Sequence, residues 1–195
     1  MRQFFMLILT LLLAGCARSP QQAQYNAEYP VRQDMRKQSV YQFQTKPITP
    51  SGARYWGAGN LAELFYVSDD QASTLEMRFN YPARSLLVTS RDPQTNIVRQ
   101  RTFILLDESV AKPSDSQTGY MYLTKDGQLL RKAKNCTPDM SVGCQWWNHT
   151  IFLTRKGDLA VNYESGGAAL MFLVLPLYGS KEYLEVFPNV SPLPG

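Results

Sequence analysis

The chain has 195 residues, 44% of them hydrophobic, and a formal net charge of +4 at pH 7. This size suits a single domain with a proper core. The 20 Lys and Arg residues are scattered and form no basic block of the kind that tracks a phosphate backbone. Composition therefore excludes nucleic acid as an expected partner.

The first sixteen residues have the organisation of a secretory signal peptide. Arg2 provides a positive start, residues 4–13 are apolar except for Thr10, and small residues precede Cys16. The apolar run has about half of the roughly 20 residues that a bilayer-spanning helix requires. Residues 1–15 are thus predicted to be a cleaved leader.

The four residues Leu13-Ala14-Gly15-Cys16 resemble the lipobox of bacterial lipoproteins, and the resemblance covers residues 1–16 only. It implies cleavage after Gly15, an S-diacylglycerol group on Cys16 and N-palmitoylation of the new amino terminus. Ala17, where Asp would imply retention, implies the periplasmic face of the outer membrane, with the inner membrane as second choice. An ordinary signal peptide with a coincidental cysteine is the alternative. Several acyl chains on one residue hold a protein stably on a membrane.

Residues 16–38 are predicted to carry the lipid and to form a flexible tether. The stretch is rich in Gln, Arg, Ala and Tyr and shows no usable apolar period. A coil of this length spans roughly 25 Å on average. Its basic residues suit anionic lipid headgroups, although a solvated linker is the simpler interpretation.

Residues 39–187 are predicted to form one β domain, because apolar and polar residues alternate with a period of two. Lys125-Asp126-Gly127 and Lys156-Gly157-Asp158 are typical of hairpin turns. A short helix is predicted only at 59–63, with Asn60 as its cap. Gly57 and Gly59 beside Tyr55-Trp56 indicate a β-bulge or a close backbone approach. The predicted strands are 41–44, 64–68, 75–81, 86–90, 98–106, 120–124, 128–133, 150–155 and 159–164.

These features predict an all-β fold, an antiparallel sandwich or small closed barrel of about nine to eleven strands. It would stand behind the flexible lipidated tether. Residues 188–195 are predicted to form a proline-rich tail that lies over the surface.

Cys136 and Cys144 remain once Cys16 is lipidated, an even pair in an exported protein. The residues between them are rich in turn formers, so a disulfide is predicted. Closing so small a ring stabilises the fold by roughly 2–3 kcal/mol in the entropic model. Two cysteines and the distant His149 have no recognisable zinc-ligand spacing, and no metal is expected.

Residues 168–178 are apolar on both alternating faces and follow Gly166-Gly167. They predict a central strand buried on both sides, or alternatively the wall of a ligand cavity or a surface that docks on lipid or a partner. Trp146 and Trp147 point to opposite faces of one strand, which leaves at least one available as a contact residue. The candidate ligand-binding residues are Trp146, Trp147 and Phe172.

His149 is the one histidine of the chain, so a Ser-His-Asp arrangement would depend on it. Alternation places it on the same face as Trp147, Ile151 and Leu153, which favours a hydrogen-bonded core histidine over a catalytic base. No Gly-x-Ser-x-Gly motif accompanies it. No catalytic residue and no cofactor is predicted.

The expected function is that of a non-enzymatic, membrane-anchored envelope lipoprotein that binds or scaffolds other envelope components, with an envelope protein as partner. A β-barrel carrier of an apolar ligand is the alternative, its cavity lined by 168–178, Met77, Phe79 and Trp147. An envelope hydrolase is a weaker second alternative. The oligomeric state is left open.

Overall fold

The computed structural model describes residues 20–52, 55–68, 71–94, 98–113, 119–137, 143–171 and 175–190. The predicted leader 1–15, the lipidation site Cys16 and the candidate ligand residue Phe172 lie outside the described residues. Within those ranges, no helix has the length and hydropathy needed to span a bilayer.

Nine strands form one sheet whose spatial order is the order of the chain, which confirms the all-β prediction. Alternation of buried and exposed side chains along β2 and β3 shows why these sequences form strands, since each has one apolar face. The strands are Val40–Gln44 (β1), Thr74–Asn80 (β2), Ser85–Arg91 (β3), Val98–Leu106 (β4), Tyr120–Leu123 (β5), Leu129–Thr137 (β6), Gly143–Leu153 (β7), Leu159–Met171 (β8) and Leu175–Phe187 (β9).

The sheet differs from the expected antiparallel sandwich or closed barrel in two ways. β4 and β5 pair in parallel, because residues 107–119 form a long connection instead of a hairpin. The strands also form one continuous sheet, and the described residues contain no second sheet packed on it. Gln44 N–H donates to Pro188 O at 2.9 Å and Phe43 forms an isolated bridge with Asn189, but the sheet is not closed into a barrel.

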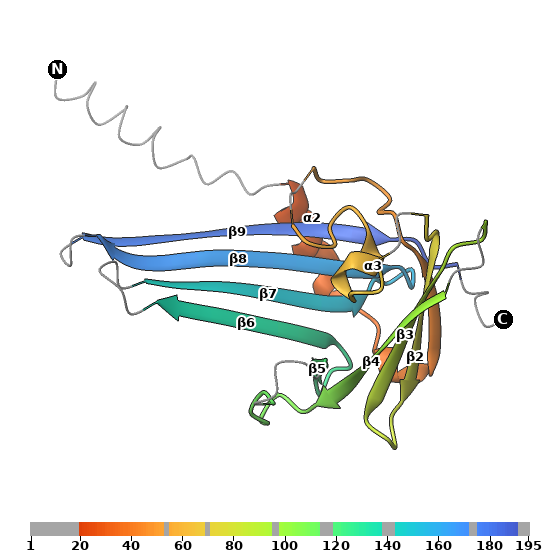
Figure 1. Ribbon diagram of the computed structural model, residues 1–195. Coiled ribbons are helices and arrows are strands. Elements are labelled where there is room, and N and C mark those ends of the chain that lie inside the picture. The colour runs from red at the N-terminus through yellow and green to blue at the C-terminus, as the bar shows by residue number, and fades with distance from the viewer. Residues whose placement is uncertain are drawn as a thin grey trace.

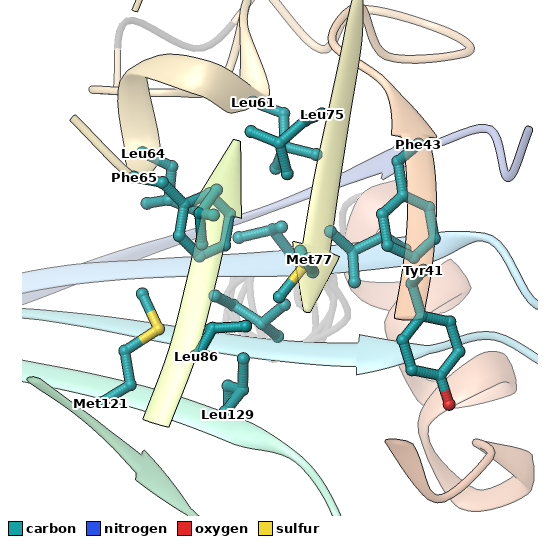
Figure 2. Close-up of a cluster of buried hydrophobic side chains, with 14 of the residues drawn as sticks. Tyr41, Phe43, Leu61, Leu64, Phe65, Leu75, Met77, Leu86, Met121 and Leu129 are labelled. Atoms are coloured by element: carbon teal, nitrogen blue, oxygen red, sulfur yellow. The ribbon is translucent and has the colours of Figure 1, made fainter. Parts of the chain in front are cut away.

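Every strand contributes to one hydrophobic cluster on the inner face of the curled sheet. Figure 2 shows Leu61 and Leu64 of α3 (Leu61–Leu64) and the following Phe65 pointing toward side chains of the strands, Leu75 and Met77 of β2 and Leu86 of β3 among them. Met121 of β5 and Leu129 of β6 complete this core and are fully buried. The core is therefore filled by side chains from all nine strands of the described residues and from α3.

The local turn predictions are confirmed. The hairpins at 124–128 and 154–158 each have a glycine at positive φ, Gly127 at 71° and Gly157 at 87°. The helix α3 (Leu61–Leu64) is capped by Asn60, whose Oδ1 accepts from Ala62 N–H at 3.0 Å. The predicted strand 64–68 is wrong, because α3 includes Leu64 and the chain then turns.

The prediction of a flexible coil over 16–38 is wrong for the described part, residues 20–38. This segment forms the helix α2 (Pro20–Glu28) and two single turns, η1 (Tyr29–Val31) and η2 (Met35–Lys37). Tyr25 and Tyr29 pack on Phe152, and Met35 is fully buried. The apolar residues of this segment do not recur at helical spacing, so the sequence pattern does not indicate a helix. Each aromatic ring nevertheless buries a large apolar surface when it packs on the sheet.

Figure 1 shows β6 to β9 running well beyond the rest of the domain, while β1 to β4 cross them at the other end. We call this extension the arm, residues 132–137, 143–148, 164–171 and 175–182. Every arm side chain whose burial the structure describes is half-buried or exposed. The arm is thus a four-stranded sheet that the domain core does not cover.

Candidate functional site

The two faces of the arm follow from the strand register. Trp147 pairs with Ala133 and Ser165, and Ser165 pairs with Lys181, so these four side chains share one face. The same face carries Ile151 nearer the domain, which is fully buried in the core. We call it the inner face, because it continues the core outward, and call the opposite side the outer face.

The inner face holds a groove with a volume of about 530 Å³. Both aromatic and polar groups border it, and Lys181 is the only charged residue among the described residues that line it. Trp147 stands at its side with 38% of its surface exposed. The lining includes Tyr55, Gln145, Trp147, Ser165, Gly167, Gly179 and Lys181.

The floor of the groove is formed by two glycines that pair across β8 and β9, Gly167 and Gly179. A Cβ at Gly179 would meet no heavy atom within 4 Å, and one at Gly167 would lie 3.6 Å from the carbonyl oxygen of Cys144. Folding therefore does not require glycine at either position, although glycine weakens a strand interior. Their effect is to leave the backbone bare beside Trp147, where another molecule can approach closely.

The third glycine of this region has a different role. Gly166 faces the outer side, where a Cβ would overlap the ring of Trp146. The indole of Trp146 thus lies across the strand, over the space that a side chain would occupy. Gly166 is required by packing within the arm, whereas Gly167 and Gly179 are not.

Tyr55 closes the end of the groove nearest the domain. Its hydroxyl is 2.8 Å from the Ser165 hydroxyl oxygen, and its ring centroid lies 5.0 Å from that of Tyr183 and 5.9 Å from that of Tyr163. The Tyr163 hydroxyl, fully buried, donates to Gly57 O at 2.8 Å. The loop that carries Tyr55 is thus hydrogen-bonded to two residues of β8, Ser165 and Tyr163.

His149 lies on the inner face between the groove and the core, next to Arg131 across the ladder. Burial, with a smaller contribution from the Arg131 charge, lowers its pKa from 6.5 to about 4. Its ring meets Tyr163 edge-on, with centroids 5.2 Å apart, and its buried Nδ1 has no hydrogen-bond partner among the described residues. In a Ser-His-Asp arrangement the carboxylate would bind this nitrogen, and no carboxylate of the described residues does so.

Arg131 is held away from the groove by the loop above it. Its guanidinium donates to Leu64 O at 3.3 Å and to the Tyr66 hydroxyl, and lies 4.7 Å from the Tyr66 ring centroid. Tyr66 itself has a positive φ of 56°, which costs energy for a residue with a side chain. These contacts fix the loop over the inner face without adding a charge to the groove.

The predicted disulfide is present at the tip of the β6–β7 hairpin. Cys136 and Cys144 are direct partners across the ladder, with an S–S distance of 2.09 Å and Cα atoms 4.1 Å apart. The bond joins the two strands on the outer face of the arm. Within the described residues, no group of His, Cys, Asp and Glu side chains is arranged to hold a metal ion.

The structure separates the candidate ligand residues that the sequence grouped. Trp147 lines the groove, whereas Trp146 lies on the outer face, as the alternation predicted. The run 168–178 is not one central strand buried on both sides, because it spans the end of β8 and the start of β9, and both Ala168 and Tyr178 are exposed. The prediction failed because a run that is apolar on both faces looks the same in the sequence whether it forms one buried strand or parts of two neighbouring strands.

The carrier alternative grouped Met77, Phe79 and Trp147 around one cavity. Met77 and Phe79 are instead packed in the core, and Trp147 lies out on the arm. Sequence reasoning missed Tyr55, Gly179 and Lys181 as groove residues. The stretches Tyr55-Trp56-Gly57 and Gly166-Gly167 held the available signal, because glycine beside aromatic residues indicates close approach.

No protein-family model, curated protein or solved structure matches this chain.

Proposed function

We propose that this protein is a lipid-anchored envelope lipoprotein that acts by binding, and that the inner-face groove of its arm holds a segment of another envelope component. The groove carries the proposal, because a partly exposed Trp147 stands beside a glycine floor that the fold does not need. Exposed tryptophan beside polar groups is the composition of binding hot spots.

The anchor is tested by labelling cells with radioactive palmitate. The full chain should incorporate label and float with membranes, because three acyl chains on Cys16 make release negligible. The Cys16→Ser variant removes the acylated sulfur and should carry no label. Equal labelling of the two proteins would contradict the anchor.

The groove is tested in cells with a photo-crosslinking amino acid at Gln145, on the inner face. We expect a discrete adduct that is absent when the same amino acid replaces Lys134, which is exposed on the outer face. Trp147→Ala should weaken the interaction by about 2 kcal/mol, roughly thirtyfold, as at other aromatic hot spots.

The matched variant for this test is Gly179→Leu. A Cβ at this position would meet no heavy atom within 4 Å, so the backbone admits a side chain there, and the Leu side chain would occupy part of the groove. We therefore expect a thermal stability close to that of the wild type and loss of the adduct. An adduct that persists in Gly179→Leu, or that forms equally well from Lys134, would rule out the groove as the binding site.

A further inference from the structure

The far end of the outer face carries an apolar surface that the fold leaves open. Cys136, Cys144, Ala168 and Tyr178 form one register row across the four strands, and Trp146 stands in the next row. The Trp146 and Tyr178 ring centroids are 5.6 Å apart, and 76% of the Tyr178 surface is exposed. We call these five residues the tip patch.

The tip patch lies on the same face as the helix α2. Tyr25 of α2 and Tyr29 of η1 pack on the cluster of Phe152, Ala160 and Leu184. The register places Leu184 on the outer face, three rows nearer the domain than Tyr178. Six residues along a strand correspond to about 20 Å. The helix and the tip patch therefore occupy two ends of one surface.

Only three residues separate Cys16 from the first residue of α2. Cys16 is four residues before Pro20, the first residue of the helix, so the distance between them is at most about 14 Å even in a fully extended chain. A lipid on Cys16 consequently holds the base of the outer face close to the bilayer. Because residues 20–38 fold onto the domain, only the residues between Cys16 and Pro20 separate the proposed lipid from it.

The chemistry of the tip patch suits the boundary between headgroups and acyl chains. Trp and Tyr are the side chains enriched at that depth, since each joins an apolar ring to a polar atom. Lys134, in the same row as Trp146, is able to extend its ammonium group toward anionic headgroups. The acidic residues Glu164 and Glu182 lie one row nearer the domain, and the two rows that form the tip patch contain no acidic residue among those described.

We propose that the tip patch rests on the bilayer, so that the outer face of the sheet faces lipid and the groove faces away from it. The inference depends on the lipid anchor proposed above. It identifies the occupant of the patch as a lipid surface, and it explains why the two tryptophans of one strand have different surroundings. Trp146 contacts the membrane, and Trp147 remains available to a partner.

The experiment uses the full chain, purified from membranes and reconstituted into vesicles of phosphatidylethanolamine and phosphatidylglycerol that carry brominated acyl chains. One variant keeps Trp146 alone (Trp56→Phe, Trp147→Phe) and its matched control keeps Trp147 alone (Trp56→Phe, Trp146→Phe). The protein with Trp146 should lose most of its emission to bromine quenching, whereas the protein with Trp147 should retain it. Adding Tyr178→Glu to the Trp146 variant should restore emission without releasing the protein from the vesicles.

The outcomes separate the two proposals. If the protein floats with the vesicles and Trp146 is not quenched, the anchor stands and the docking of the tip patch is wrong. Equal quenching of Trp146 and Trp147 would overturn the orientation in the same way. If the purified chain does not float with the vesicles, the anchor fails, and the docking that depends on it fails as well.

Discussion

The free energy of unfolding is expected to fall by up to roughly 3 kcal/mol between pH 6.5 and pH 4 through His149 alone. Burial and the Arg131 charge lower the pKa of this histidine from 6.5 to about 4, and each unit corresponds to about 1.4 kcal/mol. Between these two values the unfolded chain binds a proton that the folded chain does not. The stabilisation is complete above pH 6.5 and is lost progressively as the pH falls toward 4.

The control is His149→Phe, which keeps a ring against Tyr163 and removes the unpartnered Nδ1. Denaturant unfolding should show a free energy of unfolding that falls toward pH 4 by up to roughly 3 kcal/mol more in the wild type than in the variant. Asp34 and Glu76, whose pKa values are lowered mainly in contact with Arg36 and with Gln42 and Arg78, lose their contribution only at lower pH. An equally steep profile in both proteins would show that His149 is not the group responsible.

Burial raises the pKa of Glu185, which accepts hydrogen bonds from Ser51, so this carboxyl acts in the opposite direction. It contributes stability below its unfolded pKa, and that contribution is lost as the pH rises. Because Glu185 is unchanged in His149→Phe, the difference between the two profiles isolates the histidine.

Gly57→Ala is expected to destabilise the protein by about 3 kcal/mol and to abolish binding in the groove. Gly57 has a φ of 85°, and a Cβ there would lie 2.6 Å from Leu64 Cβ and 2.8 Å from Leu64 N. The loop would have to move away from α3, taking with it the Gly57 carbonyl that Tyr163 holds and the nearby Tyr55. The melting temperature should fall by roughly 10 °C.

The matched control is Gly52→Ala. Gly52 has a similar φ of 73°, but a Cβ there would meet no heavy atom within 4 Å. Only the backbone strain applies at that position, so we expect a loss of about 1 kcal/mol and an intact groove. Similar melting temperatures for the two variants would mean that the close contact between Gly57 and Leu64 is not formed.

The groove illustrates how far sequence reasoning reached. The opposite orientation of Trp146 and Trp147 follows from the geometry of any strand, so it was predicted without knowledge of the partners. That Trp147 has a bare floor beside it depends on the pairing of Gly167 with Gly179. Their positions in the chain do not reveal this pairing, because the register of two strands is set by every contact along them.

The N-terminal segment is a second case in which the local sequence did not indicate the structure. Residues 20–38 have no apolar period, so their local sequence indicates a coil. They fold because the rings of Tyr25 and Tyr29 pack on Phe152, and because Met35 is buried in the core among residues from distant strands. The cost in chain entropy is offset only when those strands are already in place.

The sequence by itself determined the all-β class, the strands β1 to β5 to within a residue, the two hairpin turns at Gly127 and Gly157, the capped helix at Asn60 and the pairing of Cys136 with Cys144. Each of these depends on backbone preferences or on neighbours a few residues away. Only the tertiary structure decided that β6 to β9 outrun the core, that Tyr55 ends a groove on β8, and that α2 shares a face with Trp146 and Tyr178. Those facts depend on which surfaces remain uncovered after packing, a property of the whole fold that local patterns do not encode.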